Sequence, residues 1–248
     1  MPTMVILLAL LTMFSTEPAT GLSSDERSSA IAERMVEAMG GQENWDQARF
    51  ISFTFLRRNR ALNLTWDRYM GRYRLEAKND AGIPYVVLMS LKTRQGKVYL
   101  DGREVKDGKE LSGFLNGALA VWQGETYWFL MPFKWKDEGV MLNHEGQEQI
   151  GNVVYDVVHL TFENMGRTPG DQFWAYVNLE TYLMERCRFT LQSGVEGDFE
   201  WTRWKRVGGI LVATERVGKE ETTRFEDIVV TDRMPDSVFH SPEPVTHH

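Results

Sequence analysis

Apolar and polar residues alternate along much of the chain between Phe50 and Thr231. Ile51, Phe53 and Phe55, for example, are separated by single polar residues. A period of two is typical of a strand with one buried face and one solvated face. About eleven such segments occur, joined mostly by short turns, so consecutive strands are expected to pair antiparallel.

One segment before the strands has helical spacing instead. Ile31, Met35 and Met39 recur so that they share one face of a helix, and the glycine pair at positions 40 and 41 ends it. An amphipathic helix must pack its apolar face on another element. The simplest partner here is the sheet.

A second helical segment, Lys109–Leu130, interrupts the strands in the middle of the chain. It contains Gly113, Gly117 and Gly124, each of which costs about 1 kcal/mol of helix stability relative to alanine. Such a helix is either a movable cover or a helix packed closely on the sheet. The second interpretation is favoured, because glycine inside a helix often has a packing reason.

This order of elements predicts a mainly β (α+β) fold. One large, curved antiparallel sheet would form an open half-barrel, with the N-terminal helix and a central helical lid on its concave side. An apolar cavity would remain where those helices fill the concave side incompletely. We expect a single domain over residues 22–242 and a flexible tail over residues 243–248.

The most apolar stretch lies within Glu125–Val140 and is crowded with large aromatic residues. Pro132 disfavours helix for the residue before it, so we expect a helical turn to end near Met131 and the chain to leave it extended. A run this apolar must be buried or bind something apolar. The predicted cavity-lining residues are Phe114, Leu115, Leu119, Trp122, Tyr127, Trp128, Phe129, Met131, Phe133 and Trp135.

Two lysines, Lys134 and Lys136, follow this cluster. They are interpreted as an ordinary solvated pair rather than as a contact for an anionic headgroup. The chain as a whole carries a net charge of −7, which argues against a nucleic-acid partner, since such a partner requires a basic face. A monomer is expected.

The N-terminus carries an uncharged apolar run, Met4–Phe14, that is too short to span a membrane. It resembles the apolar region of a secretory signal, with small residues around Ala19–Gly21 as a cleavage zone, so residues 1–21 are expected to be a signal peptide. The alternative is a buried N-terminal strand or helix. If the chain is exported, it is periplasmic or secreted, and soluble because no cysteine for lipidation follows the run. The single cysteine, Cys187, is expected to be a buried structural thiol.

No constellation of residues suggests catalysis, a metal or a cofactor. The sequence has no Gly-x-Ser-x-Gly, no cysteine pair and no His-x-x-x-His. His159 lies within a strand and is expected to pack there, and Asp171 is expected to stabilise its loop. An enzyme remains an alternative, which turnover lost on changing His159 or Asp171 would support.

Three motifs carry a resemblance to a known family. They are Trp128–Lys134 followed by Lys136-Asp137-x-Gly139-Val140, then Thr168-Pro169-Gly170-Asp171, and the closing Pro235-Asp236-Ser237-Val238-Phe239. With the succession of strands, they resemble the LolA/LolB-like superfamily of periplasmic lipoprotein carriers, most of all an exported branch of it. The resemblance covers residues 31–242.

The resemblance implies an open half-barrel with a helical lid that holds acyl chains in its hollow. In the carriers an arginine helps to hold the lid shut; Arg57, Arg58 and Arg60 are candidates here by position alone. The leading hypothesis is non-catalytic binding or carriage of a lipid, acyl chain or lipoprotein, with transient contact to a membrane or an envelope protein. The alternative is an envelope protein-interaction or sensor module whose cavity is filled by side chains.

Overall fold

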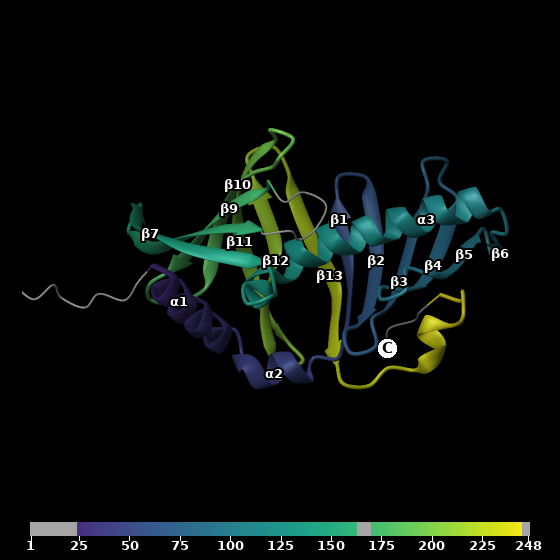
Figure 1. Ribbon diagram of the computed structural model, residues 1–248, viewed down its shortest axis with the longest axis horizontal. Coiled ribbons are helices and arrows are strands. Elements are labelled where there is room, and N and C mark those ends of the chain that lie inside the picture. The colour runs from purple at the N-terminus through teal and green to yellow at the C-terminus, as the bar shows by residue number, and fades with distance from the viewer. Residues whose placement is uncertain (1–23, 163–169, 245–248) are drawn as a thin grey trace, which may run out of the picture.

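A computed structural model of the chain describes residues 24–162 and 170–244 (Figure 1). The predicted signal peptide at residues 1–21 lies outside the described residues. So do residues 245–248 of the predicted tail and part of the Thr168–Asp171 motif.

The described residues form one 13-stranded antiparallel sheet, two strands more than expected. Its strands are β1 (Phe50–Arg57), β2 (Arg60–Asp67), β3 (Arg72–Lys78), β4 (Pro84–Ser90), β5 (Gly96–Leu100), β6 (Arg103–Glu104), β7 (Val140–Ile150), β8 (Val153–Phe162), β9 (Gln172–Asn178), β10 (Met184–Thr190), β11 (Glu196–Val207), β12 (Ile210–Gly218) and β13 (Thr222–Thr231). The spatial order is β6-β5-β4-β3-β2-β1-β13-β12-β11-β10-β9-β8-β7, so the sheet is not closed. The predicted fold class is confirmed.

This order fixes the path of the central helix. Strands β6 and β7 are the two opposite edges of the sheet, so the chain that joins them must cross from one edge to the other. It does so as a 27-residue helix over residues 108–134, which we call the central helix; Figure 1 shows its first part passing in front of β1–β5. Its parts are α3 (Gly108–Val121), the π-helical turn η1 (Trp122–Thr126), α4 (Tyr127–Leu130) and the 3-10 turn η2 (Met131–Lys134).

The prediction that the chain becomes extended after Met131 is wrong. The backbone of Met131 keeps helical angles (φ −43°, ψ −46°), and the 3-10 turn continues to Lys134. Pro132 lies in the first turn of η2, where its missing N–H costs no hydrogen bond. Pro132 therefore lies at the start of the 3-10 turn η2 instead of ending the helix.

The core lies between the sheet and its helices as one continuous cluster. Helix α1 (Ser24–Ala38) and helix α2 (Gly41–Gln47) contribute apolar side chains to it. Trp45 of α2 stacks on Phe133 with ring centroids 4.4 Å apart, and Phe129 lies 4.6 Å from Phe225 of β13. The last turns of the central helix are thus part of the core itself.

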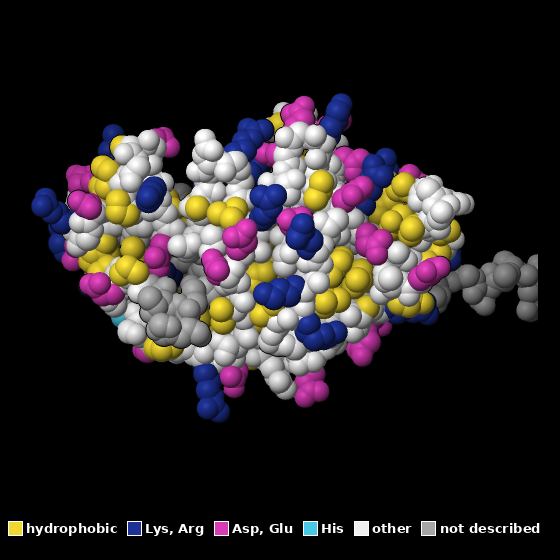
Figure 2. All heavy atoms as spheres, turned by 180° about the vertical axis from the view of Figure 1, so that it is seen from behind, with side chains coloured by type: hydrophobic (Ala, Val, Ile, Leu, Met, Phe, Trp, Pro, Cys, Tyr) yellow, Lys and Arg dark blue, Asp and Glu magenta, His cyan; other side chains and the backbone are white. Residues whose placement is uncertain are grey.

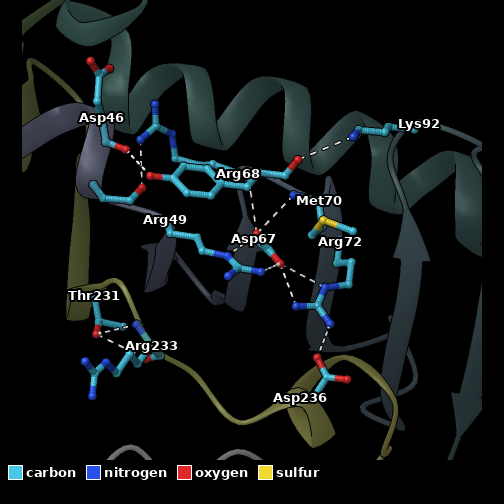
Figure 3. Close-up of polar contacts among 12 residues, drawn as sticks. Asp46, Arg49, Asp67, Arg68, Met70, Arg72, Lys92, Thr231, Arg233 and Asp236 are labelled. Carbon is cyan, nitrogen blue, oxygen red and sulfur yellow. Dashed lines mark hydrogen bonds and ion pairs between the residues drawn. The ribbon is translucent and has the colours of Figure 1, made fainter.

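A buried carboxylate ties the lower end of strands β1–β3 together (Figure 3). Asp67, fully buried, accepts hydrogen bonds from Arg49 and Arg72 and from the backbone N–H of Met70, and Arg72 also pairs with Asp236. Burial alone would raise the pKa of Asp67, but the two arginines outweigh it and hold that pKa below its ordinary value. The network links β2, β3 and the C-terminal turn η3 (Asp236–Phe239).

The C-terminal segment returns along the sheet and is held there by Arg74. This buried arginine donates hydrogen bonds to the carbonyls of Val238, Ser241 and Glu243, the last at 2.6 Å. The expected flexible tail begins at residue 243, yet the backbone of Glu243 is tied to β3.

The face of the sheet opposite α3 carries basic and acidic side chains interspersed with apolar ones (Figure 2). No sign of charge dominates this face, unlike the basic stripe of a nucleic-acid-binding surface. In the described part of the chain, no helix is long and apolar enough to span a membrane.

Candidate functional site

A cavity of about 640 Å³ lies between the second half of the central helix and strands β8–β11. It is bordered by the end of α3, by η1 and α4, and by side chains from β1, β7–β11 and β13. Its wall is mostly aromatic. The aromatic lining residues are Phe55, Trp122, Tyr127, Trp128, Phe162, Phe173, Phe189 and Phe199. The side chains of the described residues leave this volume unfilled.

One wall of the cavity is built by Trp128 against two strand phenylalanines. Phe189 and Phe199 stack with centroids 6.0 Å apart and planes 7° apart, and Trp128 meets both edge-on at 5.8 and 5.5 Å. Gly197 lies opposite Phe189 in the neighbouring strand, and a Cβ there would come within 2.2 Å of the Phe189 ring. Glycine therefore leaves the room in which that ring lies flat.

A second wall centres on Tyr127, whose ring contacts Phe162 at 5.7 Å and Phe173 at 5.9 Å between centroids. Burial raises the pKa of the Tyr127 hydroxyl well above its ordinary value. That hydroxyl has no hydrogen-bond partner among the residues the structure describes. Tyr127 thus acts in this structure mainly as an apolar wall.

The π-helical turn η1 lies directly at the cavity. The indole N–H of Trp122 and the side-chain oxygen of Gln123 are buried and, within the described ranges, have no hydrogen-bond partner. Each buried unpaired polar group costs about 1–3 kcal/mol. Turns of this kind are rare and frequently occur at functional sites. The η1 turn therefore carries an energetic cost that the side chains of the described residues do not offset.

Charged side chains lie at the rim of the cavity. Glu125 of η1 is mostly buried and pairs with Arg60 of β2 at 3.7 Å. Burial raises the pKa of Glu125, while Arg60 and Arg57 act against that rise. Lys134 pairs with Asp137 at 2.5 Å. The Glu125–Arg60 pair joins the central helix to the first hairpin of the sheet.

The buried end of the central helix is fastened by Arg216 of β12. Its fully buried guanidinium donates hydrogen bonds to the carbonyls of Trp128 and Phe129, both at 3.1 Å, and lies 3.3 Å from the centroid of the Trp201 ring. Burial lowers the pKa of Arg216, yet an arginine keeps its proton in proteins. A cation at these last carbonyls also complements the helix dipole.

Arg216 lies where the sheet opens. Strand β12 pairs with β13 over only three residue pairs, from Glu215 to Val217, and then diverges from it. The carbonyl of Ala213, beyond the paired stretch, accepts a further hydrogen bond from Arg216 at 2.9 Å. Nothing in the sequence separated Arg216 from the many other strand arginines. Its role depends on the point at which two strands part.

The three arginines named from the sequence have different places. Arg60 reaches the central helix through Glu125, whereas Arg57 and Arg58 both pair with Glu221. Arg57 also lines the cavity.

The predicted lining residues separate into three groups. Trp122, Tyr127 and Trp128 line the cavity. Four others, Phe129, Met131, Phe133 and Trp135, are 0–5% exposed and belong to the core beneath it. The remaining three, Phe114, Leu115 and Leu119, pack half-buried along α3 away from the cavity, with Phe114 5.0 Å from Tyr85.

Sequence reasoning missed the strand side of the cavity. Phe162, Phe173, Phe189 and Phe199 lie at or near strand ends and face the central helix. The only signal in the sequence was a phenylalanine recurring at the ends of successive strands. It became informative only once Tyr127 and Trp128 of the central helix were known to contact those phenylalanines.

The close-packing interpretation of the central glycines is wrong. A Cβ built at Gly113, Gly117 or Gly124 meets no atom within 4 Å outside the helix's own backbone. These glycines face open space, so they lower the stability of the helix and allow no closer packing in exchange. That leaves α3 weakly held along its outer face.

The residues considered for catalysis have structural surroundings. The ring of His159 stacks on Trp174 at 4.7 Å, with Glu145 3.4 Å from its Nδ1 atom. Asp171 accepts a hydrogen bond from the backbone N–H of Gln192 at 2.8 Å, as expected for a loop-stabilising residue, and it also borders the cavity. Cys187 is fully buried, as predicted, and burial raises the pKa of its thiol.

No protein-family profile and no curated protein sequence matches this chain. Among solved structures, the chain is similar to a DUF1329 family protein from Desulfovibrio piger, with 11% identity and a TM-score of 0.50 over 88% of this chain and 97% of that one. It is also similar to a LolA superfamily protein from Nitrosomonas europaea, with 11% identity and a TM-score of 0.45 over 81% of this chain and 97% of that one.

At 11% identity, such likeness shows the fold alone. The match at a TM-score of 0.50 agrees with an unclosed antiparallel sheet that a long helix crosses from edge to edge. The chain therefore has a LolA-like fold, which confirms at the level of the fold the resemblance drawn from its sequence.

Proposed function

We propose that this protein binds a lipid, or another molecule bearing an acyl chain, in the cavity beneath the central helix and carries it without chemical change. The observation that supports this most is the 640 Å³ space walled by aromatic rings. Its volume falls within the range of about 300–1,000 Å³ typical of ligand pockets. The cargo is a lipid or an acylated protein.

The expected affinity follows from burial of the chain. Each buried CH₂ group contributes about 0.8 kcal/mol, so about fifteen of them contribute about 12 kcal/mol. Loss of translational and rotational freedom costs at least about 4 kcal/mol, which leaves at most about 8 kcal/mol and so an affinity of about 1 μM at best. An acyl chain of ordinary length is therefore a sufficient ligand.

Entry and release would use the weak part of the central helix. The α3 helix has its glycines exposed, and η1 holds unpaired polar groups, whereas α4 is fastened by Arg216. A lid that swings at η1 would open the cavity without displacing the core. This motion would give the central helix the role of a lid, which the family resemblance implies.

Binding without catalysis is favoured by the residues at the wall. In the described part of the chain, the cavity lining includes no serine, cysteine or histidine, and its two threonines, Thr126 and Thr223, have no histidine in that lining to act as a base. Acyl transfer by a side-chain nucleophile would call for such a residue beside a base. The apolar N-terminal run supports a location in the periplasm or outside the cell, where contact with a membrane or envelope protein would load the cavity.

The proposal can be tested by filling the cavity from the helix side. In Ala120→Trp the new ring would occupy space that Ala120 borders. Asn116→Trp is the matched control, because Asn116 is exposed on the same helix. Binding of N-phenyl-1-naphthylamine, a neutral apolar dye, should weaken at least about tenfold in Ala120→Trp and stay unchanged in the control.

Native mass spectrometry of protein purified from its own cells should also detect a co-purifying lipid. Wild-type protein that takes up no dye and carries no lipid would overturn the proposal. A protein partner captured by cross-linking under those conditions would instead support the interaction or sensor module.

A further inference from the structure

The charged residues that border the cavity are unequal in number. Among the residues that the structure describes, two are cationic, Arg57 and Lys134, and three are acidic, Glu125, Asp137 and Asp171. The polar end of an amphiphilic ligand lies at such a rim when its chain fills the apolar interior. Its affinity then depends on which rim charges are still available to it.

Both cations of the rim are already engaged by carboxylates. Lys134 pairs with Asp137 at 2.5 Å, and Arg57 makes a two-pronged contact with Glu221. Beyond the rim, Lys136 pairs with Glu33 at 2.9 Å. An anionic end group would have to displace one of these carboxylates to gain a cation.

Glu125 is the opposite case. Its side chain is only 20% exposed, and its ion pair with Arg60 is long, at 3.7 Å, with half of the Arg60 side chain in solvent. Burial raises the pKa of Glu125 despite the two nearby arginines, so its charge is incompletely compensated. A positive group beside Glu125 would supply the missing compensation.

The aromatic wall favours the same sign of charge. The faces of Tyr127, Trp128 and the strand phenylalanines attract cations. Arg216, the buried cation nearby, is not part of the lining, and its hydrogen bonds go to carbonyls of the central helix and of β12. It lies behind the wall and does not provide an open anion site.

We propose that the cavity selects amphiphiles whose polar end is positively charged, and that it discriminates against free fatty acids of the same chain length. This inference rests on the proposed function, since it names the ligand class of the same cavity. Glu125 and the aromatic faces together form the recognition element, and Asp171 adds a smaller contribution at the border of the cavity.

The test uses three probes that share one alkyl chain: dodecylamine, 1-dodecanol and laurate, each below its micelle-forming concentration. Each competes at neutral pH with N-phenyl-1-naphthylamine, which has no charge. Dodecylamine should bind at least about tenfold more tightly than laurate, with 1-dodecanol between them. If laurate binds as tightly as dodecylamine, the inference is wrong while the proposed function stands. If neither the dye nor any probe binds, the proposed function itself fails.

Two variants locate the preference. Glu125→Gln should reduce the amine-to-laurate ratio to about threefold or less, and Asp171→Asn, whose side-chain oxygen can still accept the Gln192 N–H, should reduce it by a smaller factor. Glu43→Gln, exposed on α2, makes the same change in net charge far from the cavity and should leave the ratio unchanged. An equal reduction in Glu43→Gln would show that the overall negative charge sets the preference, which would overturn the inference. Asp171→Asn provides the test if Glu125→Gln fails to fold.

Discussion

The two ends of the central helix differ although they belong to one continuous segment. In α3, Ala118 is the only buried residue, and the glycines face open space. From Phe129 to Phe133 every side chain is buried, and Arg216 binds the backbone carbonyls of Trp128 and Phe129. The π-helical turn separates the two parts. One end therefore covers the sheet, while the other end is its core.

Under the function proposed above, this difference would let one helix both seal the cavity and open it. A cover that is anchored in the core at one end keeps its register when the other end lifts. The cavity lies at the junction, where Trp122, Tyr127 and Trp128 meet the strand phenylalanines. Substitutions are expected to have the largest effect at Arg216, which anchors the central helix. A smaller effect is expected at Asp67 in the sheet, and the smallest effect in α3, which covers the sheet.

The largest effect is expected from loss of the anchor. Arg216→Met would remove the guanidinium that donates to four backbone carbonyls, those of Trp128, Phe129, Ala213 and Glu215, so the free energy of unfolding should fall by about 3–5 kcal/mol. Urea unfolding measures the loss, and hydrogen exchange should rise in α4 and η2 before it rises elsewhere. Arg188→Met, an exposed arginine over Tyr176, is the control and should cost less than about 1 kcal/mol. Unchanged exchange in α4 would contradict the anchoring role.

An intermediate effect on stability is expected from Asp67 in the sheet, and this effect should depend on pH. Because the native pKa of Asp67 lies below its ordinary value of about 3.9, the unfolded chain binds this proton more readily. Its stabilisation is complete above that ordinary value and is lost as pH falls through the native pKa. Asp67→Asn should therefore cost about 2–3 kcal/mol at neutral pH, and the gap from wild type should close as the pH falls below the native pKa. A gap that persists there would point to packing instead of charge.

The contacts of Arg216 with the central helix should respond differently when the pH is lowered. Arg216 is held by carbonyls and aromatic faces, which do not titrate. Hydrogen exchange of α4 in acid should therefore rise only with global unfolding, after exchange in β2 and β3 has already increased.

The smallest effect is expected in the cover. Gly113→Ala and Gly117→Ala meet open space, so each should stabilise the protein by about 0.5–1 kcal/mol. A stiffer cover should also release the dye more slowly in stopped-flow measurements. Gly197→Ala is the contrasting substitution, because its Cβ would push the Phe189 ring from its place and weaken dye binding. Faster release from Gly117→Ala would contradict the assignment of α3 as the moving part.

Much of the fold could be predicted from the sequence, but less of the site. Alternation such as that of Ile51, Phe53 and Phe55 identified strands, since successive side chains point to opposite faces only in an extended chain. The aromatic cluster after Glu125 was recognised as central, yet Phe129 and Phe133 proved to be core while Trp128 borders the cavity. Core and cavity walls require the same apolar residues, so composition does not separate them.

The sequence by itself determined the succession of elements, because backbone periodicity and turn residues act locally. Only the tertiary structure decided that β6 and β7 are opposite edges, that the helix between them meets the phenylalanines of β8–β11, and that Arg216 donates to carbonyls of that helix. These facts depend on strand pairing between residues far apart in the chain, such as β1 with β13, and local patterns carry no record of such pairing.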